Sequence, residues 1–137
     1  MLNRRTFCLT TAAATTAAVV PGLAVASETL DYTPGLIDQR LAAGETVFAD
    51  WAADWCSTCR AQERILGALR SNNPAYDAAI TFIRVDWDQY RGAEITQRLS
   101  LPRRSTLVLL RGDQELGRIV AGTREADIQA LLDRGLA

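Results

Sequence analysis

Residues 46–60 read TVFADWAADWCSTCR, and this stretch decides the fold. It opens with a short apolar run, Thr46–Ala49, which predicts a buried strand that ends near Asp50. A short loop then leads to Cys56, and apolar residues recur at helical spacing from Cys59 onward. The stretch therefore predicts a strand-to-helix junction that carries two cysteines in a C-x-x-C pattern.

The position of the first cysteine predicts its chemistry. Backbone N–H groups point outward at the start of a helix, and the positive end of the helix favours a thiolate over a thiol. Cysteines in such places have pKa values of roughly 3.5–7.5 instead of about 8.5. A thiolate attacks a disulfide to form a mixed disulfide, which a second thiol resolves. We expect Cys56 to attack, and Cys59, one turn inside the helix, to be more buried and to resolve.

Two other interpretations of the C-x-x-C pair stay open at this point. The pair could form a structural disulfide, although a ring of four residues constrains little chain and stabilises little. It could instead bind a metal, which would need two further ligands from elsewhere in the protein. We expect neither a metal nor a cofactor.

Outward from this stretch, strand and helix patterns alternate. Residues 27–33 form a linker or an edge strand, and Gly112 and Asp113 form a turn. The other expected elements are a helix between Pro34 and Gly44, strands over 80–85, 106–110 and 115–120, a helix over 92–99, and a final helix with Thr123 as its N-cap. This order predicts an α/β fold: a central mixed sheet flanked by helices, with a C-terminal antiparallel hairpin followed by a helix.

Residues 1–26 differ from the rest of the chain. They consist of a basic start, an uncharged middle rich in Ala and Thr, and a small-x-small motif that ends at Ala26. This is the pattern of a signal peptide that is removed by cleavage. We therefore expect two segments, a signal peptide over 1–26 and a single domain over 27–137.

The basic start also suggests the route of export. Arg4 and Arg5 lie within Asn3–Phe7, which resembles a twin-arginine signal, and an ordinary Sec signal is the alternative. Either route predicts a periplasmic protein. Cleavage near Ala26 would remove Cys8, so that the mature chain keeps only the C-x-x-C pair. Two cysteines at this spacing in an exported protein indicate dithiol chemistry.

Composition excludes several other classes of function. The chain has 16 acidic residues and 15 basic ones, all of them Arg, and it has no His. Triads and dyads that depend on His are thereby excluded, as is P-loop chemistry, which depends on Lys. The formal net charge of −1 gives no electrostatic reason to expect a nucleic-acid partner.

The segment Val47–Arg60 resembles the active-site segment of the thioredoxin superfamily. Its A-D-W-C-x-x-C form resembles above all exported thioredoxin-like proteins that are similar to the C-terminal periplasmic domain of DsbD. The similarity extends over Thr46–Leu132. It implies a thioredoxin fold and an exported thiol-disulfide oxidoreductase that reduces or exchanges protein disulfides. It also implies protein disulfide substrates and an upstream redox partner, for which a membrane protein is one candidate, and we expect a monomer.

The resemblance assigns a role to an acid beneath the dithiol. Asp50 matches the buried acid that assists proton transfer at the resolving thiol. Its position supports this, because a carboxyl at the end of a buried strand is desolvated and its pKa rises. An exposed acid at a strand end is the alternative. Arg84 matches a position where the family often has a cation near that acid, and a solvated edge charge is its alternative.

The resemblance also assigns substrate-binding residues. Trp55 matches the tryptophan that packs over the attacking cysteine, although plain core packing would also explain it. Gly122 matches a glycine beside the active-site face, or is simply a turn before the last helix. Aligning Thr106 with the start of the third strand puts Ser105 where the family has a cis-proline, and the resemblance implies that both residues bind substrate. Either a loop shift brings Pro102 into that place, or the substrate-facing backbone is altered.

This departure has a chemical consequence at Ser105. A cis peptide bond before a residue other than proline costs ~2.5–4 kcal/mol, which favours the trans form. In a loop that otherwise follows the family, the hydroxyl and N–H of Ser105 lie within reach of Cys56 and favour its thiolate. Arg103 and Arg104, which precede Ser105, either recognise an acidic partner or form a solvated basic loop.

A second class of function remains as the alternative. The chain could be a redox-inactive binding module that keeps the fold and uses the dithiol to dock a metal or a partner.

Overall fold

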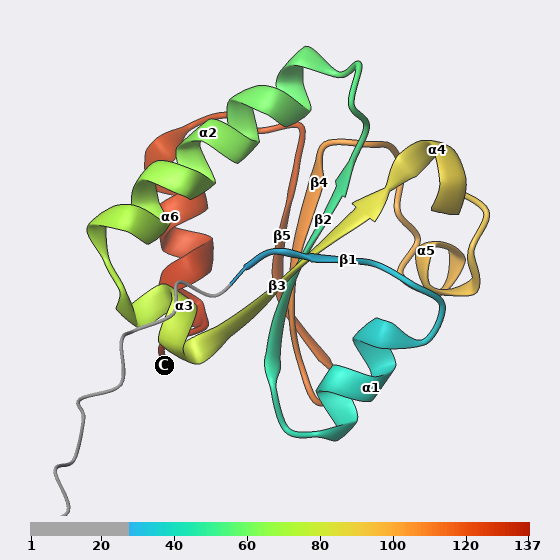
Figure 1. The fold of residues 1–137 in the computed structure, drawn as a ribbon, viewed down its shortest axis with the longest axis horizontal. Helices are drawn as coiled ribbons and strands as arrows, with labels where there is room; N and C mark the ends of the chain where they lie inside the picture. Colours follow the sequence, from blue (N-terminus) through green and yellow to red (C-terminus); the bar gives the residue numbers. More distant parts are fainter. Residues whose placement is uncertain (1–27) are drawn as a thin grey trace, which may run out of the picture.

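The computed structural model describes residues 28–137, so the predicted signal peptide and its cleavage site lie outside the described residues. The strands are β1 (Leu30–Asp31), β2 (Thr46–Ala52), β3 (Ile80–Asp86), β4 (Thr106–Arg111) and β5 (Gln114–Val120). They form one sheet in the order β1-β3-β2-β4-β5 (Figure 1). The central strand β2 is parallel to β3 and antiparallel to β4, and β4 and β5 form an antiparallel hairpin.

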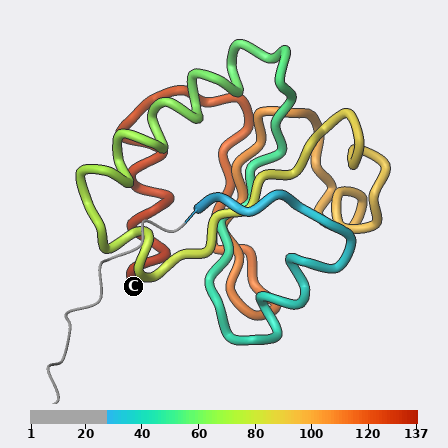
Figure 2. Tube along the Cα trace, viewed as in Figure 1, coloured from blue at the N-terminus to red at the C-terminus, as the bar shows by residue number. Residues whose placement is uncertain are grey.

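The helices cover both faces of this sheet. They are α1 (Leu36–Ala42), α2 (Ser57–Asn72), α3 (Ala75–Ala79), α4 (Trp87–Tyr90), α5 (Glu94–Arg98) and α6 (Glu125–Arg134). Helices α2, α3 and α6 lie on one face, and α1, α4 and α5 lie on the other; Figure 2 shows the chain passing from face to face. The predicted architecture, a mixed sheet flanked by helices with a terminal hairpin and helix, is confirmed.

Each face of the sheet has its own hydrophobic core, and β2 contributes to both. Val47, Ala49 and Trp51 pack toward α1 and α5, whereas Phe48 packs toward α2, α3 and α6. Side chains alternate between the two faces of a strand. Asp50 therefore points to the same face as Phe48, beneath α2.

Of two local predictions for the helices, one was confirmed and one was wrong. The helix expected over 92–99 is α5, which lies within that range. Helix α4 was not predicted; the Asp86 carboxylate accepts the Asp88 amide at 3.0 Å and caps it. Thr123 is not the N-cap of α6, since that helix begins at Glu125 and Arg124 occupies the cap position without a side-chain hydrogen bond.

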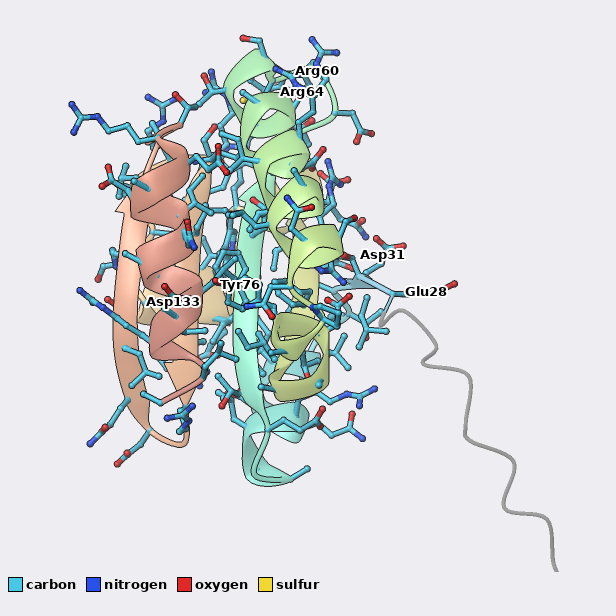
Figure 3. All side chains as sticks on the ribbon, turned by 90° about the vertical axis from the view of Figure 1, so that its left-hand side faces the viewer. Glu28, Asp31, Arg60, Arg64, Tyr76 and Asp133 are labelled. Carbon is cyan, nitrogen blue, oxygen red and sulfur yellow. The ribbon has the colours of Figure 1, made fainter. Side chains whose placement is uncertain are left out.

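Two further segments complete the fold. Of the two interpretations of residues 27–33, the edge strand is confirmed, because Leu30 and Asp31 pair in parallel with β3. The sequence did not predict α3, which follows Pro74. This helix is anchored by the Tyr76 hydroxyl, which donates to the Asp133 carboxylate at 2.5 Å and so joins α3 to α6 (Figure 3). No helix within 28–137 has the length and apolar character to cross a membrane.

Candidate active site

The two cysteines lie at the junction of β2 and α2. Cys56 is the N-cap residue of α2, which begins at Ser57, two residues before the predicted helical pattern starts at Cys59. Its sulfur accepts the backbone N–H of Cys59 at 3.2 Å, as the side chain of an N-cap residue does. Both thiols are buried, with 3% of Cys56 and none of Cys59 exposed. The order of burial expected from the sequence, Cys59 deeper than Cys56, is thus the order observed.

One hydroxyl lies between the two sulfurs. The Oγ atom of Ser105 is 3.2 Å from Cys56 Sγ and 3.0 Å from Cys59 Sγ. Ser105 precedes β4, and the pairing of Trp51 with Thr106 brings the end of β2 beside the start of β4. The alignment that placed Ser105 beside the dithiol therefore agrees with the geometry, and Pro102 does not take its place.

The surroundings give the two thiols opposite acidities. Burial alone would raise the pKa of Cys56, but hydrogen bonds from the Cys59 thiol, Ser105, the Cys59 amide and Arg104 outweigh it and lower the pKa to about 6. Burial raises the pKa of Cys59, and its hydrogen bond to Cys56 raises it further. At neutral pH Cys56 is thus the thiolate and Cys59 the thiol.

Asp50 is buried beneath this pair, with 6% of its surface exposed, so the exposed alternative is wrong. Its Oδ1 atom has no hydrogen-bond partner among the described residues. Burial raises the pKa of Asp50 to about 7, and the nearby Glu63 and Cys56 charges add to this while Arg84 opposes it. A carboxyl with this pKa can accept and return a proton near neutral pH.

Arg84 lies beside that acid and is not a free edge charge. It is paired with Asp50 in the register of β2 and β3. Its guanidinium forms ion pairs with Asp54 at 2.9 Å and Glu63 at 3.1 Å. The cation is therefore shared among three carboxylates, which limits how far it can lower the pKa of Asp50.

The backbone of Ser105 is held in an uncommon conformation. Its φ angle is +63°, in the left-handed region, and no cis peptide bond occurs within 28–137. The Ser105 amide donates to the Trp51 carbonyl at 2.7 Å, and the Ser105 carbonyl accepts the Ala121 amide at 2.8 Å. These bonds fix the hydroxyl between the thiols.

Gln62 is a site residue that the sequence interpretation missed. Its side chain is fully buried in α2, and its Nε2 atom donates to the carbonyls of Ser105 and Gly122, both at 3.0 Å. The available signal was its spacing, because Gln62 lies on the buried face of the helix with Cys59 and Leu66. A polar side chain at a core position needs a hydrogen-bonding partner.

The other predicted substrate-binding residues differ in their contact with the dithiol. Trp55 is 57% exposed, so the alternative that it simply packs in the core is wrong. Its indole N–H donates to Asp88 at 2.8 Å, and the Arg104 guanidinium lies 4.4 Å from its ring centroid. It is Trp87 that packs against the buried cysteines. Thr106 is buried, and its hydroxyl donates to the Arg103 carbonyl at 2.7 Å, away from the sulfurs.

Gly122 reaches the site only through Gln62. Its carbonyl accepts the Gln62 amide, and a Cβ atom at Gly122 would lie 2.7 Å from Ile119 Cγ2. The residue therefore serves the turn and the site together. Within 28–137, no cluster of three Cys, Asp or Glu side chains is arranged to hold a metal ion.

The chain matches the thioredoxin family over residues 29–134 and belongs to that family. Mitochondrial thioredoxin-2 of Schizosaccharomyces pombe is 32% identical over 71% of this chain and 65% of its own length. The thiol:disulfide interchange protein DsbD of Pseudomonas fluorescens is 28% identical over 73% of this chain and 17% of its own length. The chain thus spans less than two thirds of these relatives.

The match extends to solved structures. The crystal structure of Trxlp from Edwardsiella tarda has a TM-score of 0.67 and 30% identity, and it covers 77% of this chain and 98% of its own. The thioredoxin fold implied by the resemblance is thereby confirmed. The likeness to DsbD concerns a small part of that protein, and a special closeness to it is not established.

Proposed function

We propose that this protein is an exported thiol-disulfide oxidoreductase that reduces or exchanges protein disulfides through Cys56 and Cys59. The observation that carries the proposal is the division of the pair: an N-cap thiol whose pKa is lowered to about 6, next to a fully buried thiol whose pKa is raised. The names of its relatives, thioredoxins and a thiol:disulfide interchange protein, support the same class of reaction.

The first half-reaction starts at Cys56, the less deeply buried thiol. The Cys56 thiolate attacks one sulfur of a substrate disulfide, forms a mixed disulfide and releases the other sulfur as a thiolate. The Cys59 thiol then loses its proton, for which Asp50 is the nearby acceptor, and attacks Cys56 Sγ. The products are a Cys56–Cys59 disulfide and a fully reduced substrate, so two electrons have passed to the substrate.

The second half-reaction needs a reductant that returns two electrons to the protein. We propose a dithiol-bearing redox partner upstream, and a membrane protein of the exporting cell is one candidate. The partial similarity to DsbD supports a role in such a relay. Residues 1–26 support delivery to the periplasm through their signal-peptide pattern.

The roles of the two thiols are tested with single-cysteine variants of the mature domain. Cys56→Ser should abolish the reduction of insulin disulfides. Cys59→Ser should accumulate a mixed disulfide, which is detected by non-reducing gel electrophoresis. Alkylation at pH 6 provides the second measurement, because only a thiolate reacts rapidly. Faster alkylation of Cys59 than of Cys56 would reverse the assignment.

The binding-module alternative is separated by the same protein preparation. A dithiol that oxidises and reduces reversibly without metal supports the oxidoreductase. A metal retained in stoichiometric amount after purification, with no turnover of disulfides, would support the module.

A further inference from the structure

Four arginines surround the dithiol, and they come from three separate segments. Arg60 follows Cys59 in α2, Arg103 and Arg104 precede Ser105, and Arg124 follows the turn at Gly122. Figure 3 shows Arg60 at the end of α2 that starts at the dithiol. Cross-strand pairing of Thr106 with both Trp51 and Val120 brings the other two segments to the same edge of the sheet. We call these four residues the basic rim.

No member of the basic rim forms an ion pair within residues 28–137. Of the nine other arginines in this range, Arg40, Arg70, Arg84, Arg98 and Arg118 pair with an Asp or Glu side chain, whereas Arg64, Arg91, Arg111 and Arg134 do not. The cause is not a shortage of acids, since this part of the chain holds all 16 acidic residues and all arginines except Arg4 and Arg5. Apart from the hydrogen bond between Arg104 and the Cys56 thiolate, the positive charge of the rim is therefore not paired with an acidic group of the described residues. The basic rim is distinguished by its place at the dithiol and not by the absence of ion pairs alone.

Four acids in the segments around the dithiol form no ion pair with the rim in the part of the chain that the structure describes. Asp54 pairs with Arg84, Asp88 accepts the Trp55 indole N–H, and Asp86 caps α4. Glu125 follows Arg124 directly but forms no ion pair with it within the described residues. None of the four acids forms an ion pair with the basic rim within the described residues.

Arg104 links the rim to the attacking thiol, because its side chain hydrogen-bonds to Cys56. Its guanidinium is stacked over the indole of Trp55 at 4.4 Å, and its Nε atom is buried without a hydrogen-bond partner. Stacking orients a planar guanidinium, and its donors that do not face Cys56 remain for an incoming carboxylate. The ring itself is 57% exposed, so an incoming chain meets Trp55 and Arg104 together, next to Cys56.

We propose that the basic rim is a docking surface that selects disulfides within acidic polypeptide segments. This inference rests on the oxidoreductase function proposed above and names its substrate class. A polypeptide fits better than a small disulfide, because only an extended chain reaches Arg60, Arg104 and Arg124 at the same time. Carboxylates on either side of the substrate cystine would contact the rim while Cys56 attacks the disulfide.

The test uses two disulfide-bridged peptides that differ only in the residues flanking the cystine, Asp and Glu in one and Lys and Arg in the other. The pre-reduced protein converts each to its dithiol in a single turnover and becomes the Cys56–Cys59 disulfide. We expect the second-order rate constant to be roughly threefold to tenfold higher for the acidic peptide, and the ratio to fall as salt is added.

Charge reversal locates the effect. Arg60 and Arg124 are both exposed. Arg60→Glu and Arg124→Glu should each lower the ratio of the two rate constants, acidic peptide over basic peptide, by several-fold. Arg40→Glu is the matched control, because Arg40 pairs with Glu45 just before β2, at the opposite end of that strand from Cys56. The ratio cancels any change in the reactivity of Cys56, since both peptides meet the same thiolate.

A neutral substrate, bis(2-hydroxyethyl) disulfide, separates the two proposals. Failure to reduce this compound and both peptides would contradict the oxidoreductase function itself. Reduction with equal rates for the two peptides, or a ratio that Arg60→Glu and Arg124→Glu leave unchanged, would overturn the docking surface alone. Oxidised glutathione is the small anionic comparison. If its rate constant exceeds that of the neutral disulfide by as much as the rate constant of the acidic peptide does, the choice of a polypeptide is overturned.

Discussion

Ser105 couples the two thiols through a single hydroxyl. A hydroxyl has one proton to donate and lone pairs with which to accept. When Cys56 is a thiolate, Ser105 donates to it and accepts from the Cys59 thiol, so the three groups form a chain of hydrogen bonds. The same residue thus stabilises the attacking form of Cys56 and holds the proton that Cys59 must lose in the resolving step.

Removing this hydroxyl should weaken the thiolate. We expect Ser105→Ala to raise the Cys56 pKa by about one to two units, the equivalent of one hydrogen bond to a charged group. A less stable thiolate also makes the reduced form less stable, so the reduction potential should fall. The pH dependence of alkylation and equilibration with glutathione measure the two quantities.

The choice of replacement matters because of the backbone at this position. Proline fixes φ near −65° and has no N–H, whereas Ser105 has a φ of +63° and donates its amide to Trp51. Ser105→Pro would therefore rearrange the loop. Ser105→Gly is the suitable second variant, since it also lacks the hydroxyl but accepts this φ freely. Ala and Gly variants that both keep a Cys56 pKa near 6 would show that the hydroxyl has no such effect.

Asp50 should make both stability and turnover depend on pH. Its pKa in the folded protein is about 7, against about 3.9 when unfolded, so between pH 4 and 7 the folded state keeps a proton that the unfolded state has lost. The contribution of Asp50 to the free energy of unfolding therefore decreases as pH rises through this window, by up to about 4 kcal/mol, whereas the lowered pKa of Cys56 acts in the opposite direction above pH 6.

Asp50→Asn should remove this slope, stabilise the protein at neutral pH and slow the resolving step. Urea unfolding at pH 5 and pH 8, together with a pH–rate profile, provides the measurement. Asp113→Asn, in the exposed hairpin turn, is the control. If Asp50→Asn and the parent protein showed the same difference in free energy of unfolding between pH 5 and pH 8, a raised pKa of Asp50 would be contradicted.

The candidate site was predictable where it depended on local pattern. Cys56, Cys59 and Asp50 lie in one stretch, and the positions of strand and helix predict which thiol is the more deeply buried and which acid lies beneath the pair. Gln62 and the exposure of Trp55 were not foreseen. They depend on contacts with segments far along the chain, 43 and 60 residues away for Gln62 and 33 for Trp55.

At the scale of elements, α2 supports the site twice. Cys56 caps the first turn of the helix. In the next turn Gln62 donates hydrogen bonds to the segment before β4 and to the segment after β5. Both segments contain a residue with positive φ, Ser105 at +63° and Ala121 at +60°. Such conformations persist only where the surrounding structure fixes them, and the amide of Gln62 bonds directly to one of the two residues.

Gln62→Met tests whether this clamp positions Ser105. The replacement keeps the length of the side chain and removes its two donors, and it also removes the unpartnered Oε1 atom, so stability should change by less than about 1 kcal/mol. We expect the Cys56 pKa to rise, because a looser Ser105 donates a poorer hydrogen bond. Gln97→Met, on exposed α5, is the matched control.

A purely structural role would give the opposite pair of results. Loss of stability in Gln62→Met with an unaltered Cys56 pKa would show that the side chain only fills the core.

The elements themselves were predictable to different degrees. Strands β2, β3 and β4 were found because continuous apolar runs in a buried sheet are distinctive. Helices α3 and α4, of five and four residues, were not predicted because they have too few turns for a periodic pattern. The start of α6 was misjudged because Thr123 is a good capping residue by type, whereas the chain reaches α6 only after the turn that Gln62 fixes.

At the scale of the whole molecule, the chemistry is concentrated at one edge of the sheet. The thiols, Asp50, the basic rim and Trp55 all lie at or near the end of β2 and the start of β4, while the two cores fill the rest of the domain. Substrate, proton acceptor and docking charges therefore meet without any movement of the sheet.

The route of export is the last property of the whole chain that can be tested. A twin-arginine signal is read by a receptor that requires the arginine pair, whereas a Sec signal needs only positive charge before an apolar stretch. Arg4→Lys combined with Arg5→Lys keeps the charge and removes the pair. We expect this double variant to remain in the cytoplasm as the uncleaved precursor, measured by fractionation and by the mass of the chain, with cleavage near Ala26 in the parent protein. Arg60→Lys, in the mature domain, is the control for a change of arginine to lysine as such. Undiminished export of the double variant would instead establish the Sec route, and the proposed periplasmic function would stand on that route.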